Sequence, residues 1–281
     1  MPERLRAGLI GSGIALSRTP RMHMEEGKAA GLDYRYDLVD TEGDDTPLSD
    51  HLDRAEAAGF AGVNITHPFK QAVLEHVDDV SASVAAIGAS NTVVFRGGTR
   101  IAHNTDAWGF AEGFRRSLRD AKVSRVLLVG AGGAGLAVAH ALMDCGVGQL
   151  LVFDAEEGAA KSLCRSVSAA WGADRVSVAG SVAAAMEVAE GVVNATPVGM
   201  AAYPGSAVPL AALCPSHWVA DIIYFPLETE LIRASRKLGC RVMSGADMAI
   251  FQAVRAFELF TGIAADPARM RASFEGFDRA N

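Results

Sequence analysis

Strand-like and helix-like segments alternate along almost the whole of this chain, and this alternation limits the possible folds more than any other feature. The apolar, strand-like runs are 6–11, 34–40, 62–66, 125–130, 149–154, 175–180, 191–196, 218–224 and 241–245. Between them apolar residues recur at helical spacing, as at Leu136, Ala139 and Leu142. Strands that alternate with helices predict βαβ units and a mostly parallel sheet, so the expected fold class is α/β.

Two domains are expected because the chain, at 281 residues, exceeds the usual size of one. A hairpin is expected at 91–105, with Gly97-Gly98 between its strands, and it marks the end of the first domain. A helix at about 107–119 then leads into the second domain. An apolar helix is expected from Asp247 to about Phe260, and a helical segment at about 267–276 follows it.

The charges and cysteines exclude several kinds of partner. Lys+Arg 26 against Asp+Glu 33 give a net charge of −7, scattered without long runs, which argues against nucleic acid or an anionic membrane. The four cysteines lie far apart, without a CxxC pair or a histidine at metal-ligand spacing, so they are interpreted as reduced core residues and no metal is expected.

The sequence has no signal-peptide pattern and no apolar run of about 18 residues, so the expected location is the cytoplasm.

A glycine-rich loop, GAGGAG at 130–135, follows an apolar strand and precedes a helical pattern. In that context the glycines allow a tight turn and a close approach of the backbone to a pyrophosphate at a helix N-terminus. Asp154 ends the next strand, about 24 positions after the first glycine, near the spacing of a carboxylate that binds an adenosine ribose. The loop predicts a Rossmann dinucleotide-binding domain; the alternative is a glycine-rich turn that binds nothing.

Four polar segments of the first domain stand at expected strand ends: LSRT at 16–19, NITHPFK at 64–70, ASNT at 89–92 and HNTD at 103–106. Ligands of open α/β sheets bind at the carboxyl ends of the strands, so these segments are expected to converge on one small polyhydroxylated ligand. Taken singly, each has another explanation. Asn91 could start a turn, Asp106 could cap a helix beginning near Trp108, and Lys70 could be a solvated helix residue.

These segments carry a resemblance to a known family. The chain resembles the shikimate dehydrogenase family over essentially its whole length. The matching elements are SRTP at 17–20, NITHPFK at 64–70, GASNT at 88–92, NTD at 104–106, GAGGAG at 130–135, NATPVGM at 194–200 and Gln252. THPFK, SRTP and Asp154 look most like the NAD-dependent quinate/shikimate dehydrogenases. Two departures are present: SRT replaces the commoner SKS, which bears on substrate choice, and GASNT replaces GAVNT.

The resemblance implies a discontinuous α/β substrate domain, 1–105 and 246–281, and a Rossmann domain that binds NAD at 106–245. It implies that Lys70 and Asp106 are the catalytic pair. The residues implied to bind the substrate carboxylate or ring hydroxyls are Ser17, Thr19, Thr66, Asn91, Asp106 and Gln252, with Tyr224 near the junction with the nicotinamide. The residues implied to line the dinucleotide are Gly130, Gly132, Gly133, Ala134, Gly135, Asp154, Thr196 and Gly245.

The expected activity is the NAD-dependent interconversion of shikimate and 3-dehydroshikimate and of quinate and 3-dehydroquinate. Lys70 can take the hydroxyl proton and Asp106 can orient it. His67 is a rival that points away from Lys70 if strand alternation continues to the end of NITHPFK. Acidic residues at 154, 156 and 157 favour NAD over NADP. The alternatives are an NADP-dependent biosynthetic shikimate dehydrogenase and a catalytically silent dinucleotide sensor. A monomer or a homodimer is expected.

Overall fold

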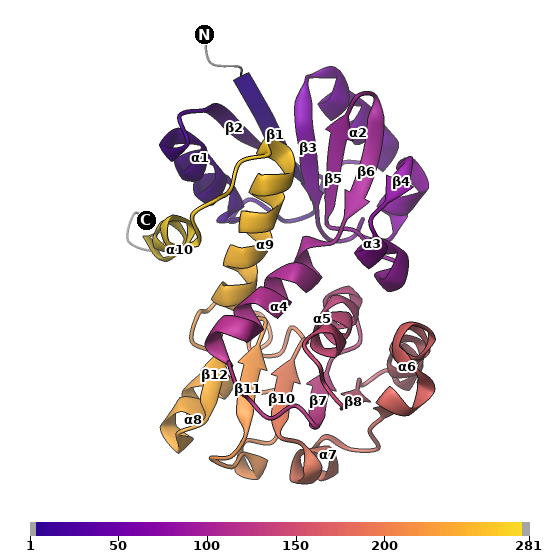
Figure 1. Ribbon diagram of the computed structural model, residues 1–281, viewed down its shortest axis with the longest axis vertical. Coiled ribbons are helices and arrows are strands. Elements are labelled where there is room, and N and C mark those ends of the chain that lie inside the picture. The colour runs from indigo at the N-terminus through magenta and orange to yellow at the C-terminus, as the bar shows by residue number, and fades with distance from the viewer. Residues whose placement is uncertain (1–3, 277–281) are drawn as a thin grey trace. The chain divides into compact units, whose positions relative to one another are not determined.

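A computed structural model describes residues 4–276 of the chain (Figure 1). The chain divides into two compact units: the first takes the residues up to 105 and from 250 onward, and the second takes 106–249. Helix α9 (Gly245–Thr261) runs through the later division, and the boundary expected at 245/246 falls inside the same helix. Residues 1–3 and 277–281 of the expected substrate domain lie outside the described part.

The first unit contains a mixed six-stranded sheet in the order β2-β1-β3-β5-β6-β4. The strands are β1 (Arg4–Gly11), β2 (Asp33–Asp40), β3 (Phe60–Ile65), β4 (Asp79–Val80), β5 (Thr92–Arg96) and β6 (Thr99–His103). Its helices are α1 (Thr19–Ala29), α2 (Leu48–Ala57), η1 (Ala72–His76), α3 (Ala82–Ile87), α10 (Pro267–Glu275) and the later part of α9. β1 is parallel to β2 and β3, whereas β5 is antiparallel to β3 and β6. The expected hairpin around Gly97-Gly98 is therefore confirmed.

The second unit contains a parallel six-stranded sheet in the order β12-β11-β10-β7-β8-β9. The strands are β7 (Arg125–Val129), β8 (Gln149–Phe153), β9 (Val176–Val178), β10 (Gly191–Asn194), β11 (Trp218–Asp221) and β12 (Arg241–Met243). The helices are α4 (Thr105–Ser117), α5 (Gly133–Asp144), α6 (Glu157–Trp171), η2 (Ala173–Arg175), α7 (Val182–Val188), η3 (Leu210–Ala212) and α8 (Glu230–Leu238). This strand order reverses direction between β7 and β10, which is the arrangement of a Rossmann domain. The predicted two-domain α/β class is confirmed.

Each unit has its own apolar core. Ile10, Leu52, Val63 and Val93 form part of the first, and the central strand β7 is buried along Val126–Leu128 in the second. A central parallel strand is covered on both faces, which explains its continuous apolar sequence. Across residues 4–276, none of the helices combines the length and the apolar character that a bilayer span requires.

The later part of α9 completes the core of the first unit. The ring of Phe257 lies 5.9 Å from that of His23 on α1 and 5.5 Å from that of Tyr34 on β2. Burial in this ring cluster lowers the pKa of His23 to about 3, so the imidazole is neutral at physiological pH. Its Nδ1 and the Tyr34 hydroxyl are 3.0 Å apart, within hydrogen-bond distance.

Candidate functional site

In the first unit, main-chain hydrogen bonds tie together the loops at the carboxyl ends of β1 and β3. The Ser12 N–H donates to the His67 carbonyl at 2.9 Å, and the Thr66 N–H donates to the Ile10 carbonyl at 3.0 Å. The Ser90 N–H donates to the Lys70 carbonyl at 2.8 Å. The segment before β5 is thereby joined to NITHPFK, at the sheet edge where the polar segments were expected.

Lys70 lies in the turn between β3 and η1, and its side chain is partly buried. Thr66, also partly buried, opens this turn and accepts the Phe69 N–H at 2.9 Å through its carbonyl. The condition on which His67 was expected to point away from Lys70 is not met, because β3 ends at Ile65 and strand alternation does not reach residue 67. His67 itself is exposed.

Asn91 is held by buried side chains, and it is only 5% exposed. Its Oδ1 accepts the Thr105 N–H at 2.7 Å and the Thr92 hydroxyl at 3.1 Å, while its Nδ2 donates to the Thr105 hydroxyl at 3.0 Å. One hydrogen of Nδ2 therefore remains for a ligand. Asn64 Nδ2 donates one hydrogen to the Thr92 hydroxyl and the other to the Asn91 carbonyl, and Asn64 Oδ1 accepts the Tyr36 hydroxyl. The polar groups of the Asn64 side chain are thus all used, and Asn64 supports Asn91.

Asp106 lies in the first turn of α4 and is 4% exposed. The explanation that it caps a helix starting near Trp108 is wrong, because α4 begins at Thr105. The positive end of the helix dipole favours an ionised carboxylate at this place. Since Asn91 binds the amide of Thr105, the preceding residue, the hydrogen-bond network also fixes where the chain enters Asp106.

Ser17 and Thr19 flank the start of α1, and both are partly buried. The Ser17 hydroxyl accepts the Thr19 N–H at 3.3 Å. Arg18 between them is buried, and its guanidinium donates to the Phe274 carbonyl on α10. Gln252 is partly buried on α9, in the part of that helix that belongs to the first unit.

In the second unit, two positions of the glycine loop are glycine because the backbone leaves no room for a side chain. Gly130 has a φ of 104°, and a Cβ there would lie 2.7 Å from the carbonyl of Ala195. A Cβ on Gly135 would lie 2.1 Å from the Gly130 oxygen. At Gly132 and Gly133, which are exposed, a Cβ would meet nothing within 4 Å.

The open side of the loop fits a pyrophosphate. α5 begins at Gly133, and no side chain caps its first turn, so its amide N–H groups and the positive end of its dipole remain for an anion. Ala134, which is partly buried, lies in this first turn. This cradle is the part of the structure that fits the predicted dinucleotide.

Asp154 follows β8 directly and contacts the glycine loop. Its Oδ2 accepts the Ala131 N–H at 2.6 Å, and its Oδ1 accepts the Glu156 N–H at 2.9 Å. The cation nearest in sequence, Lys161, forms a 2.8 Å ion pair with Glu157. The segment after β8 therefore presents carboxylates, with its one lysine paired within α6.

A buried network that was not identified from the sequence holds Thr196. The Thr196 N–H and hydroxyl donate to Asn194 Oδ1 at 3.0 and 2.7 Å, and Asn194 Nδ2 donates to Asp221 Oδ1 at 3.0 Å. Asp221 Oδ2 accepts the Thr229 hydroxyl at 2.7 Å. Burial raises the pKa of Asp221 to about 6, against the opposing effect of these hydrogen bonds.

Gly245 and Tyr224 lie at the same end of the second sheet. A Cβ on Gly245 would lie 2.3 Å from the carbonyl oxygen of Ile223, so only glycine allows α9 to begin against this segment. Tyr224 is 45% exposed in the segment after β11. Within the described residues, no group of three His, Cys, Asp or Glu side chains is placed to hold a metal ion.

Comparison with known proteins gives matches along the chain. A model described as the shikimate dehydrogenase substrate binding domain matches residues 9–93, and one described as the shikimate 5'-dehydrogenase C-terminal domain matches residues 245–273. A ThiF family model matches residues 106–195, the part that contains the glycine loop.

Proteins with similar sequences cover nearly the whole chain. The quinate/shikimate dehydrogenase (NAD(+)) of Corynebacterium efficiens is 49% identical over 97% of this chain and 98% of that protein. The shikimate dehydrogenase (NADP(+)) of Streptomyces avermitilis is 47% identical over 94% of this chain and 93% of its own length. A solved structure of quinate dehydrogenase from Corynebacterium glutamicum in complex with NAD has a TM-score of 0.94 at 45% identity, covering 97% of this chain and 99% of that one. This chain belongs to the shikimate dehydrogenase family.

Proposed function

We propose that this protein is an oxidoreductase that catalyses the reversible, NAD-dependent oxidation of shikimate to 3-dehydroshikimate and of quinate to 3-dehydroquinate. One observation carries the proposal. The polar segments of the first unit gather at one sheet edge, in a chain that is 49% identical to a quinate/shikimate dehydrogenase (NAD(+)) along 97% of its length.

The two units take different parts in this activity. Residues 1–105 and 246–281 form the proposed substrate-binding and catalytic domain, and residues 106–245 form the proposed NAD-binding domain. The glycine cradle at 130–135 supports the second assignment, since its exposed side is open and meets an uncapped helix N-terminus. Thr196 and Gly245 would line the same ligand farther along the sheet.

Lys70 is the proposed proton acceptor. When bound, NAD supplies the acceptor for the hydride that leaves the carbon bearing the reacting hydroxyl. The Lys70 amine takes the proton of that hydroxyl, so the alcohol loses a hydride and a proton and becomes a ketone. Asp106, whose carboxylate is buried at the start of α4, would orient the amine and accept a substrate hydroxyl. In the reverse direction Lys70 returns the proton to the ketone oxygen.

The remaining polar residues of the first unit would orient the substrate. Ser17 and Thr19 would bind its carboxylate through their hydroxyls. Thr66 and Gln252 would bind ring hydroxyls, and Asn91 would do so through the one Nδ2 hydrogen that its network leaves. On the second unit, Tyr224 would lie near the junction of the substrate and the nicotinamide.

The proposed cofactor is NAD, with NADP as a weaker alternative. A 2′-phosphate beside the ribose would meet the carboxylates of Asp154, Glu156 and Glu157, and the one lysine of that segment is already paired. A relative that is 47% identical is a shikimate dehydrogenase (NADP(+)), so both cofactor preferences occur among similar sequences. We also infer a cytoplasmic enzyme, monomeric or homodimeric, without a nucleic-acid or membrane partner. The net charge of −7 supports the last of these inferences, because nucleic acids and anionic membranes repel an acidic surface.

Steady-state assays test the proposal directly. Shikimate and quinate are each combined with NAD and with NADP, and the absorbance of the reduced cofactor is followed. The proposed enzyme reduces NAD with both substrates. Reduction of NADP alone would indicate the biosynthetic type of activity, and cofactor binding without reduction in any combination would indicate a dinucleotide sensor.

A further inference from the structure

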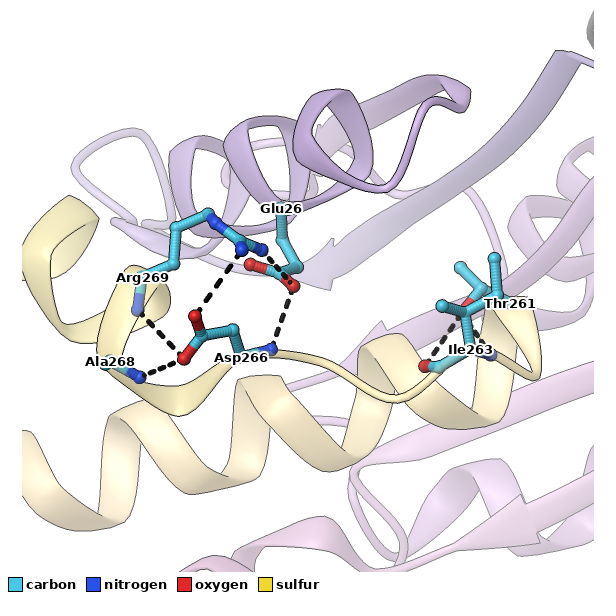
Figure 2. A network of polar contacts seen from close by, with 6 residues as sticks. All are labelled: Glu26, Thr261, Ile263, Asp266, Ala268 and Arg269. Carbon is cyan, nitrogen blue, oxygen red and sulfur yellow. Dashed lines mark hydrogen bonds and ion pairs between the residues drawn. The ribbon is translucent and has the colours of Figure 1, made fainter.

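Helices α1 and α10 form an antiparallel pair that polar contacts hold at both ends. At the end shown in Figure 2, the Glu26 carboxylate on α1 is 2% exposed and binds the start of α10. Its Oε1 accepts the Asp266 N–H at 2.9 Å and forms a 2.7 Å ion pair with Arg269 (Figure 2). Asp266 in turn caps α10 by accepting the Ala268 N–H at 2.8 Å. The first turn of α10 is therefore fixed on α1.

At the other end of the pair, Arg18 is bound to the last turn of α10. The Arg18 side chain is 5% exposed, and its Nη1 donates to the Phe274 carbonyl at 3.0 Å. The guanidinium carbon lies 4.8 Å from the centre of the Phe274 ring, which is itself buried. The last turn of a helix carries the negative end of the helix dipole, so a buried cation is well placed beside the Phe274 carbonyl and ring.

Arg18 stands between the two hydroxyl residues assigned to the substrate carboxylate. Ser17 accepts the Thr19 N–H through its hydroxyl, and no side chain caps α1 from the Arg18 position. Adjacent Cα atoms are about 3.8 Å apart, so a shift of Arg18 must move both neighbours. The contact between Arg18 and Phe274 therefore restrains the backbone that carries Ser17 and Thr19.

We propose that Arg18 is a positioning residue for substrate recognition, acting through α10 to hold Ser17 and Thr19 in the geometry that binds the carboxylate. This inference rests on the proposed function. It assigns a role in substrate affinity to α10, which begins at Pro267 and contacts residues of α1 that lie far from it in the sequence. Hydrogen-bonding groups must be held within fractions of an ångström to bind well. Loosening Arg18 should therefore weaken the binding of substrate more than the binding of cofactor.

Arg18→Met tests the role, because methionine keeps an unbranched apolar stem against Phe274 and removes every donor. We expect the KM for shikimate to rise about tenfold, with kcat within about threefold and the KM for NAD within about twofold of wild type. Arg18→Lys retains a charged donor group without the planar guanidinium, and its KM for shikimate should lie between those of wild type and Arg18→Met. If Arg18→Met does not fold, Arg18→Lys carries the same comparison.

Arg21→Met is the matched control. Arg21 lies on the same helix and donates to the Gly276 carbonyl at 2.9 Å, at the same end of α10, but it flanks neither hydroxyl residue. Its KM for shikimate should stay within about twofold of wild type, whatever the change in melting temperature. Equal KM effects of Arg18→Met and Arg21→Met would overturn the proposal, because the role would then be general stability.

Methyl shikimate identifies the group through which Arg18 acts, since its carboxylate is esterified. If Arg18 positions the carboxylate site, Arg18→Met should lower kcat/KM about tenfold for shikimate and about twofold or less for the ester. Equal losses for the two compounds would overturn the assignment. Phe274→Leu, which leaves Ser17, Arg18 and Thr19 unchanged, should raise the KM for shikimate several-fold if the effect passes through α10. An unchanged KM in that folded variant would also overturn it.

The two proposals fail in different ways. A wild-type enzyme that reduces no cofactor with either substrate contradicts the proposed function, and the role of Arg18 falls with it. An active wild type whose Arg18 variants keep their KM for shikimate contradicts only the positioning role.

Discussion

The main-chain N–H of Ala131 donates a 2.6 Å hydrogen bond to Oδ2 of Asp154. This bond joins the glycine loop to the first residue after β8. The Asp154 carboxylate therefore holds the shape of the loop and also places a negative charge beside the expected ribose site. Charge-assisted hydrogen bonds of this kind are short and comparatively strong.

Asp154→Ala should reduce the preference for NAD. In wild type we expect kcat/KM with NAD to exceed that with NADP by at least about 10²-fold, because the 2′-phosphate would meet the carboxylates that follow β8. Removing Asp154 should lower kcat/KM with NAD and bring the ratio below about tenfold. Steady-state kinetics with both cofactors measure this ratio, with Glu187→Gln, an exposed residue of α7, as the control. Equal use of both cofactors by wild type would mean that Asp154 does not face the ribose.

Lys70→Ala should lower kcat by roughly 10²–10⁴-fold, the usual contribution of a positioned acid or base, and should change the KM for NAD much less. Lys28→Ala, which removes an exposed lysine from α1, is the control and should leave both parameters unchanged. The measurement is a pH profile of kcat for the three proteins. Near-normal turnover of Lys70→Ala at every pH would remove the assignment.

Asp221 should make stability depend on pH. Burial raises its pKa to about 6 from the ordinary 3.8 of an aspartate, so the folded state binds a proton more tightly than the unfolded chain does. This contribution is fully present below pH 3.8 and is lost as the pH rises through about 6, at a cost of about 3 kcal/mol to the free energy of unfolding.

Asp221→Asn removes that titration. Urea unfolding of wild type and variant across pH 4–7 should show the variant gaining stability relative to wild type as the pH rises, even if it is less stable throughout because the Thr229 and Asn194 contacts change. Parallel stability curves over this range would contradict the expectation.

Quinate should be accepted as well as shikimate. The two share the carboxylate and three ring hydroxyls and differ at C1, where quinate carries an added hydroxyl, so only groups beside the carboxylate can separate them. Ser17 and Thr19 hydroxyls can both donate and accept, which satisfies either compound. Shikimate should be favoured by no more than about 10²-fold in kcat/KM. Turnover of shikimate without any turnover of quinate would contradict this assignment of Thr19.

Strong local patterns made most of the fold predictable from the sequence. The run at 125–130 predicted β7 because a central parallel strand is apolar on both faces, and Gly97-Gly98 predicted the hairpin. The two-residue strand β4 and the short helix α3 were missed because neither is long enough to establish a period. α4 begins two residues before its expected start because Thr105 is held by Asn91, which lies 14 positions earlier.

Sequence patterns pointed to the candidate site residues but not to the contacts that support them. Lys70 and Asn91 lie within recognisable motifs at strand ends. The hydrogen bonds that link Thr196 through Asn194 to Asp221, by contrast, depend on β10 and β11 being neighbours. Arg18 and Phe274 are 256 positions apart in the sequence, so no local sequence pattern predicts their contact. Contacts that depend on which elements become neighbours cannot be read from periodicity.

The ring cluster of the first unit also orders events during synthesis on the ribosome. His23 and Tyr34 are made early, whereas Phe257 and Phe260, which pack with His23, come from the last part of the chain. Domains generally fold as units while the chain emerges. Here the unit that begins first cannot close its core until after the whole of 106–249 has been translated. A nascent chain stopped before α9 therefore lacks the rings that cover His23 and Tyr34, and it exposes apolar surface of the kind that promotes aggregation.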